Sequence, residues 1–239
     1  MTVLLYPTDS YLREFSAQVV AANPEQHAVA LDRTAFYPGG GGQPNDTGWL
    51  LVDAIEIPVV KVKREGEHIW HWLAPDAALP AVGALASSRL DWERRHALMR
   101  THTALHILCG VVWRDYGAQV TGGNMEPLEG RMDFEFATLR AELVGEIEAR
   151  CNAEVAAARA VRVQILPRDE AFQIPDLIRT KINMLPEEIS AVRTVETVGL
   201  DLQADGGTHV ANTREVGTIR VTDYKSKGAI NKRIYISVG

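Results

Sequence analysis

The chain has 239 residues, of which 46% are hydrophobic and 23% are charged, a composition typical of globular proteins. No apolar run approaches the ~20 residues needed to span a bilayer, and the N-terminus lacks the basic segment of a signal peptide. Cys109 and Cys151 are the two cysteines, which does not favour a disulfide framework, so we expect a cytoplasmic protein. The net charge of -6 argues mildly against a nucleic-acid partner, although basic patches at 61–64 and 225–233 leave local RNA contact open.

Residues 1–88 alternate short apolar runs with turn residues, and examples of such runs lie at 28–31, 49–52 and 59–62. This spacing is typical of a small antiparallel β-barrel. The stretch 74–88 is rich in alanine and proline and has weak periodicity. We therefore expect a β-barrel domain over residues 1–88 and a second domain over residues 89–239.

The pattern changes to a helix after Asp91, which is a plausible N-cap. Gly110 is expected to weaken this helix and Gly117 to end it. Later segments predict a strand at 131–136, a helix at 140–159 and a strand at 161–166. Further strands are expected near 191–203, 208–212, 216–222 and 230–238. The chain is thus predicted to be α+β, a small barrel followed by an α/β domain with a mixed or antiparallel sheet and helices.

His102 and His106 stand four residues apart in the expected helix, so both imidazoles share one face and could meet one metal ion. Such a pair also arises by coincidence at the edge of a core. The zinc-protease pattern H-E-x-x-H does not apply, because Thr103 follows the first histidine. Cys109 falls on the same face, and geometry alone permits it as a ligand. Its apolar neighbours favour a buried, inert thiol.

A second half-site lies in the segment DLQADGGTHVANTREVG. Strand alternation puts Asp201, Gln203 and Asp205 on one face. Two glycines then permit a reversal that returns His209 to the neighbourhood of Asp205. A hairpin with a turn aspartate is the structural alternative. Two short half-sites together predict a discontinuous tetrahedral metal site.

Four consecutive glycines, 39–42, precede Gln43. No Gly-Lys-Ser/Thr and no helix follow them, so neither a phosphate loop nor a dinucleotide-binding turn is predicted. Such a run lets the backbone pass close to a ligand with its N–H groups free. Gln43 adds a donor and an acceptor. A flexible hairpin is the alternative.

Four segments together resemble the alanyl-tRNA editing family: TAFYPGGGGQPNDTG, HTALHIL, RMDFE and DLQADGGTHVANTREVG, in this order and spacing. These stand-alone proteins are similar to the editing domain of alanyl-tRNA synthetase. The resemblance spans the whole chain, and the glycine-rich motif is typical of the medium-length members, which keep a β-barrel. The resemblance implies one zinc ion per chain. His102, His106 and His209 match the family ligands, whereas Asp205 stands where the family has a cysteine. That aspartate could bind zinc directly or hold a water on it.

The resemblance further implies a hydrolase that removes serine, and glycine as a second candidate, from mischarged alanine tRNA without using ATP. It places Gln43 and Thr121 at the substrate, and alternation adds Gln203 as a substrate contact. Asp205 is an alternative general base, although no base is singled out. Zinc would lower the pKa of a bound water or polarise the ester carbonyl. Two alternatives stay open: an RNA-binding module of the same fold that has lost catalysis or zinc, and a zinc hydrolase for small esters.

Overall fold

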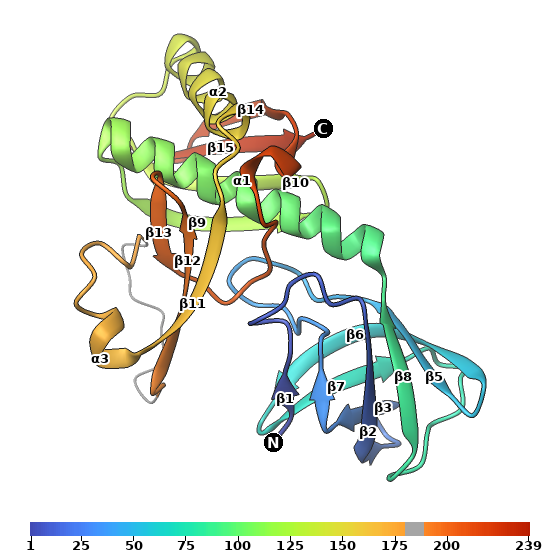
Figure 1. Ribbon diagram of the computed structural model, residues 1–239. Coiled ribbons are helices and arrows are strands. Elements are labelled where there is room, and N and C mark those ends of the chain that lie inside the picture. The colour runs from blue at the N-terminus through green and yellow to red at the C-terminus, as the bar shows by residue number, and fades with distance from the viewer. Residues whose placement is uncertain (180–188) are drawn as a thin grey trace. The chain divides into compact units, whose positions relative to one another are not determined.

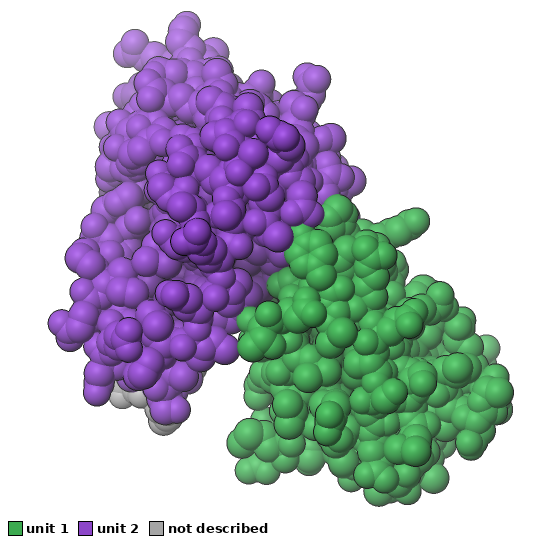
Figure 2. Space-filling model, in the orientation of Figure 1, with its two compact units in different colours: residues 1–96 green, residues 97–239 purple. Residues whose placement is uncertain are grey.

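The computed structural model describes residues 1–179 and 189–239. The chain divides into two compact units, Met1–His96 and Ala97–Gly239, which Figure 2 shows in different colours. The division falls inside helix α1 (Trp92–Tyr116). Among the helices of the described ranges, none combines the length and apolar character that a membrane span requires.

Unit 1 is a closed six-stranded barrel with the strand order β2-β3-β7-β6-β5-β8 (Figure 1). A short parallel pair, β1 and β4, accompanies it. The strands are β1 (Val3–Leu4), β2 (Glu14–Asn23), β3 (Ala28–Leu31), β4 (Arg33–Thr34), β5 (Gly48–Val52), β6 (Ile55–Glu65), β7 (His68–Leu73) and β8 (Leu85–Leu90). The predicted small barrel is confirmed.

Alternation along the barrel strands creates the core of unit 1. In β7 the side chains of Ile69, His71 and Leu73 are buried, while the residues between them are partly exposed, as the period of two requires. Strand β8 pairs with both β2 and β5, which closes the barrel and leaves no free edge. This strand occupies the end of the alanine- and proline-rich stretch, so part of that stretch belongs to the barrel.

The described residues of unit 2 form two antiparallel sheets, β14-β15-β10-β9 and β11-β12-β13. Helix α1 packs on the first sheet, since a Cβ added to Gly130 in β10 would lie 3.1 Å from Leu105. Its elements after α1 are β9 (Val120–Glu126), β10 (Glu129–Glu135), α2 (Ala141–Ala156), β11 (Val161–Pro167), α3 (Arg168–Ala171), β12 (Ala191–Thr197), β13 (Asp201–Ala204), a 3-10 turn η1 (Thr213–Val216), β14 (Ile219–Ser226) and β15 (Asn231–Val238). The predicted α+β class is confirmed.

Helix α1 begins and ends where the sequence predicts. Asp91 Oδ1 accepts the Arg94 N–H at 3.1 Å, which satisfies one of the unpaired donors at the helix start. Gly117 follows the last turn with φ 64°, a left-handed conformation that favours glycine. The helix continues through Gly110, where a Cβ would lie 2.9 Å from both Asp201 Cβ and Leu200 Cγ. Gly110 therefore permits close packing of α1 against the start of β13.

Several segments differ from the expectation, and β9 is a strand that the sequence does not predict. Residues 208–212 form no strand, because Asn212 instead caps η1: its side chain accepts the Arg214 N–H at 2.9 Å and its N–H donates to Glu215. The stretch 191–203 is a hairpin of two strands, β12 and β13. Helix α2 ends at Ala156, before the predicted residue 159, since Ala158 adopts φ 51°.

Candidate metal centre

Three histidines and one aspartate converge in unit 2. Helix α1 supplies His102 and His106 one turn apart, and the turn after β13 supplies Asp205 and His209. One ligand atom from each residue lies within 4.8 Å of the other three. The histidines are buried, with exposed fractions of 4%, 6% and 3%. This cluster could hold a metal ion.

Asp205 occupies the centre of these contacts. Its Oδ1 lies 3.4 Å from His102 Nε2 and 3.9 Å from His106 Nε2. Its Oδ2 lies 3.0 Å from His209 Nε2, so the turn through Gly206 and Gly207 brings the two residues together as predicted. Ligands at ~2.1 Å from a tetrahedral ion are separated by ~3.4 Å. The two Oδ1 distances, 3.4 and 3.9 Å, are close to that separation.

The surroundings of His106, His209 and Asp205 shift the pKa values of these groups. Burial lowers the pKa of His106 to about 4, with His102 adding to the effect and Asp205 opposing it. Burial also holds the pKa of His209 well below its usual value. Burial acts to raise the pKa of Asp205, but His102 and His209 outweigh it and the pKa is well below the usual range. Neutral imidazoles at His106 and His209 and an ionised carboxylate at Asp205 are the forms in which these groups bind metal ions.

Thr103 supports His209 from α1. Its Oγ1 lies 3.2 Å from His209 Nδ1 and accepts the Val210 N–H at 3.2 Å. Histidine ligands commonly donate the second ring N–H to such a partner, which fixes the tautomer and the ring orientation. The Nε2 atom of His209 is therefore the one turned toward the cluster. The residues present thus fit a borderline divalent ion such as zinc.

Cys109 lies on the buried side of α1, 1% exposed, and burial strongly raises the pKa of its thiol. Its side chain is hydrogen-bonded to Gln203. It is not among the four converging ligands of the described residues. A thiol that stays protonated is a poor metal ligand, which agrees with its interpretation as a core residue.

Gln203, a predicted substrate contact, lies on β13 next to Asp201. Its Nε2 donates a short hydrogen bond to Asp201 Oδ2. Asp201 in turn accepts the Arg179 Nε–H at 2.9 Å. The side chain thus belongs to a polar network beside Cys109. Its role toward a substrate stays a prediction.

Thr121, the second predicted substrate contact, lies exposed on β9. Its hydroxyl donates to Asn231 Oδ1 at 3.0 Å. Within the described ranges, this hydrogen bond joins it to β15 and not to the histidine cluster. The predicted contact with the substrate hydroxyl remains a prediction.

Gln43 lies in unit 1, at the end of the glycine run, and is 3% exposed. The loop is ordered by its own backbone: Gly40 and Gln43 exchange N–H···O bonds of 3.0 and 2.9 Å. All four glycines have positive φ, which explains why this run contains no side chains. The run thus folds as a tight hydrogen-bonded turn, and the flexible-hairpin alternative stays open. The catalytic role of Gln43 stays a prediction.

A buried ion pair holds the base of this loop. Asp46 accepts the Tyr37 N–H at 2.6 Å. The Arg95 Nε–H donates to both Asp46 oxygens, each at 3.0 Å. The Arg95 guanidinium also donates to the carbonyls of Ser10 and Ala35. Each buried charge therefore has partners.

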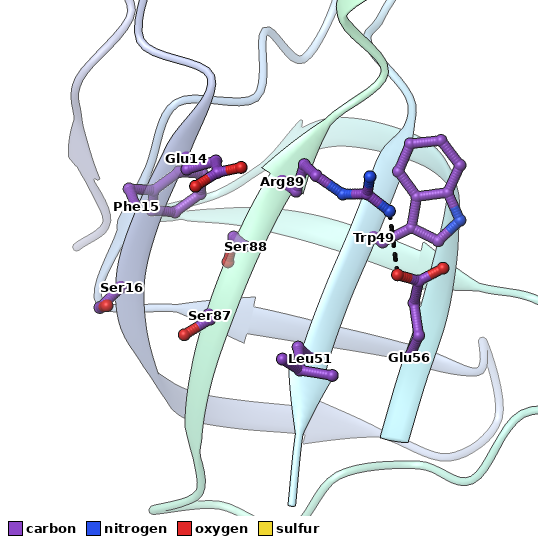
Figure 3. Close-up of a pocket in the computed structure, with 9 residues that line it drawn as sticks. All are labelled: Glu14, Phe15, Ser16, Trp49, Leu51, Glu56, Ser87, Ser88 and Arg89. Carbon is purple, nitrogen blue, oxygen red and sulfur yellow. Dashed lines mark hydrogen bonds and ion pairs between the residues drawn. The ribbon is translucent and has the colours of Figure 1, made fainter. Parts of the chain in front are cut away.

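A hollow of about 440 Å³ lies on the barrel among strands β2, β5, β6 and β8 (Figure 3). Arg89 lies over the Trp49 ring, 4.7 Å from its centroid, and donates to Glu56 at 2.9 Å (Figure 3). No histidine or cysteine lines it, and the Glu56 carboxylate is already paired. Its lining does not offer the donor set of the histidine cluster.

The sequence does not predict the contacts that two further residues make with the cluster. Arg193 on β12 contacts Asp205, and Thr103 contacts His209. A hydroxyl one residue after His102 carries no signal of its own in a single sequence. Arg193 is found only through the pairing of β12 with β13, because the sequence predicts a single strand near 191–203.

Comparison with protein families gives two matches. Residues 192–235 match the "Threonyl and Alanyl tRNA synthetase second additional domain", a stretch that contains Asp205 and His209. Residues 9–94 match "tRNA synthetases class II (A)", which corresponds to most of unit 1.

Individual relatives match over the full length. The alanyl-tRNA editing protein AlaX-M of Saccharolobus solfataricus is 40% identical, covering 100% of this chain and 99% of its own. That of Methanosarcina acetivorans is 37% identical, with coverage of 100% and 99%. The alanine–tRNA ligase of Ignicoccus hospitalis is 37% identical over 91% of this chain, which corresponds to 24% of the ligase. The resemblance seen in the four sequence segments is thus confirmed. This chain belongs to the alanyl-tRNA editing proteins of the AlaX-M type.

Proposed function

We propose that this chain removes serine from mischarged alanine tRNA by hydrolysing the aminoacyl ester, with glycine as a second substrate. Its membership of the alanyl-tRNA editing family supports a deacylating hydrolase with a tRNA partner. The observation that carries the proposal of a metal-dependent site is the convergence of His102, His106, Asp205 and His209. The reaction needs no ATP and belongs in the cytoplasm, where tRNA is charged.

The proposed cofactor is one zinc ion held by the three imidazole Nε2 atoms and by Asp205. When bound, zinc supplies Lewis-acid polarisation of the ester or of water. The protein contributes the rest of the site. Thr103 orients His209, and the Gly207 N–H holds Asp205 Oδ2 at 2.7 Å. Asp205 would act as a ligand through Oδ1, which faces His102 and His106, and its carboxylate is the alternative general base.

Substrate recognition is assigned to Gln43, Thr121 and Gln203. Each offers a hydroxyl or an amide, which is what a site needs to hydrogen-bond the seryl hydroxyl. Sites built on such hydrogen bonds reject a substrate that lacks the partner, since their polar groups are then left unsatisfied. Alanine lacks this hydroxyl, so correctly charged tRNA would be spared.

The direct test compares deacylation of Ser-, Gly- and Ala-charged alanine tRNA, together with metal analysis of the purified chain. We expect one zinc per chain, rapid loss of serine and slow loss of alanine. Equal rates for serine and alanine would overturn the proposed recognition. Tight tRNA binding without metal or turnover would instead favour the RNA-binding module.

Two variants test the fourth ligand. Asp205→Cys should retain both metal and activity, because thiolate is a common zinc ligand. Asp205→Ala should lose much of both. Full metal content and full activity of Asp205→Ala would show that Asp205 is neither ligand nor base.

A further inference from the structure

Arg193 makes a two-part contact with Asp205. The residues lie opposite each other where β12 and β13 run antiparallel, and the Asp205 N–H donates to the Arg193 carbonyl at 3.0 Å. The Arg193 Nη1 donates to the Asp205 carbonyl at 2.9 Å and lies 3.6 Å from Asp205 Oδ2. The side chain is 8% exposed. A guanidinium is thus held against both the backbone and the carboxylate of one residue.

The two oxygens of Asp205 have different surroundings. Oδ2 accepts the Gly207 N–H at 2.7 Å and also lies 3.0 Å from His209 Nε2, with the guanidinium 3.6 Å away. Oδ1 lies toward His102 and His106. A carboxylate whose second oxygen is bound by the protein offers a metal its first oxygen in a fixed direction.

We propose that Arg193 is a positioning residue of the metal centre, which holds Asp205 so that Oδ1 faces the ion. This inference rests on the proposed metal site and adds to it a residue that contributes no ligand atom. Two effects of opposite sign compete. A positive charge beside the site disfavours a cation, whereas a fixed carboxylate favours it. The orientation of the carboxylate outweighs the charge repulsion, so removal of the guanidinium weakens metal binding although it also removes a positive charge.

The test measures the dissociation constant of Zn²⁺ for the full chain by competition with a chromogenic chelator. It also records the visible absorption of the Co²⁺-loaded chain, which reports ligand geometry without any turnover. Arg193→Met should bind Zn²⁺ about 10- to 100-fold more weakly, the range usual for loss of a residue that orients a ligand. Its Co²⁺ spectrum should change. Arg193→Lys, which keeps the charge but not the planar donor pair, should also bind more weakly than the wild type.

A matched control is Arg233→Met. Arg233 binds the Asp133 carboxylate at 2.6 and 2.7 Å in the β10–β15 pair, so the same change removes a guanidinium from a carboxylate away from the cluster. Its Zn²⁺ affinity should equal that of the wild type. Equal or tighter Zn²⁺ binding by Arg193→Met would overturn the inference. Failure of the wild type to bind Zn²⁺ would instead overturn the proposed metal site, so the two failures are distinguishable. Circular dichroism of each variant identifies any that fails to fold, and Arg193→Lys then decides.

Discussion

The two units bury the same kinds of side chain with different consequences. In the barrel, His71 has one partner for each ring nitrogen: Thr34 Oγ1 at 2.9 Å and the Val29 carbonyl at 3.3 Å. In unit 2, the three cluster histidines have ring centroids only 4.2–5.0 Å apart. Burial lowers the pKa of both His71 and His106 to about 4. A lowered pKa therefore does not distinguish a structural from a functional histidine here, whereas convergence does.

The aspartates Asp46 and Asp205 differ between the two units in the same way as the histidines. Asp46 in the barrel meets a single arginine that neutralises it. Asp205 meets three imidazoles and stands beside Arg193. The Asp46 carboxylate is neutralised within the fold, whereas the Asp205 carboxylate belongs to a cluster that could hold a metal ion.

The largest expected effect is on the stability of unit 1. Asp46→Ala leaves Arg95 buried without its counter-charge, which should lower the free energy of unfolding by about 3–5 kcal/mol. Chemical denaturation measures this. Glu56→Ala removes an ion pair of half-exposed side chains and should cost about 0–1 kcal/mol. Equal effects of the two variants would refute the idea that Asp46 closes a buried network.

The pH dependence of the barrel follows from His71. Its pKa is about 4 in the fold and ~6.5 when unfolded, so the fold requires the neutral ring. This contribution is complete above pH ~6.5 and is lost as the pH falls toward 4, a change of about 3 kcal/mol. Urea denaturation at several pH values, with metal removed, should give a flatter profile for His71→Gln than for the wild type. Parallel profiles would contradict the assignment.

Loss of a converging histidine should affect activity more than stability. His106→Ala removes one of four ligands, and we expect the deacylation rate to fall by more than ~100-fold, about 2.7 kcal/mol. Metal content should fall with it. His71→Gln, a change at an equally buried histidine, should keep its metal. Wild-type metal content in His106→Ala would contradict the distinction between a ligand histidine in unit 2 and a structural histidine in unit 1.

The smallest predicted effect concerns Thr103. Thr103→Val removes the partner of His209 Nδ1 and should weaken Zn²⁺ binding about 10-fold. Thr101→Val is the matched control on the same helix, since the Thr101 hydroxyl likewise accepts a backbone N–H, that of Leu128 at 2.8 Å. Zn²⁺ titrations of both variants should separate them. Equal affinities would show that the Thr103 hydroxyl does not orient the ligand.

Much of the centre could be predicted because the positions of its residues follow from short sequence patterns. A separation of four puts His102 and His106 on one helix face, and two glycines permit the return from Asp205 to His209. Barrel strands are likewise visible from alternation. Interactions between distant segments could not be predicted. The pairing of Arg193 with Asp205, and the capping of η1 by Asn212 in place of a strand, depend on which backbones meet.

Gly110 shows how a residue without functional groups can set the spacing within a cluster of donor atoms. Helix α1, which carries His102 and His106, meets the start of β13, which leads to Asp205, at this position. A single added carbon at Gly110 would collide with Asp201 and Leu200. Any larger residue would force the helix and the strand apart and shift the donor atoms of the two elements relative to one another. The absence of a Cβ atom at Gly110 therefore helps to set the distances between the donor atoms.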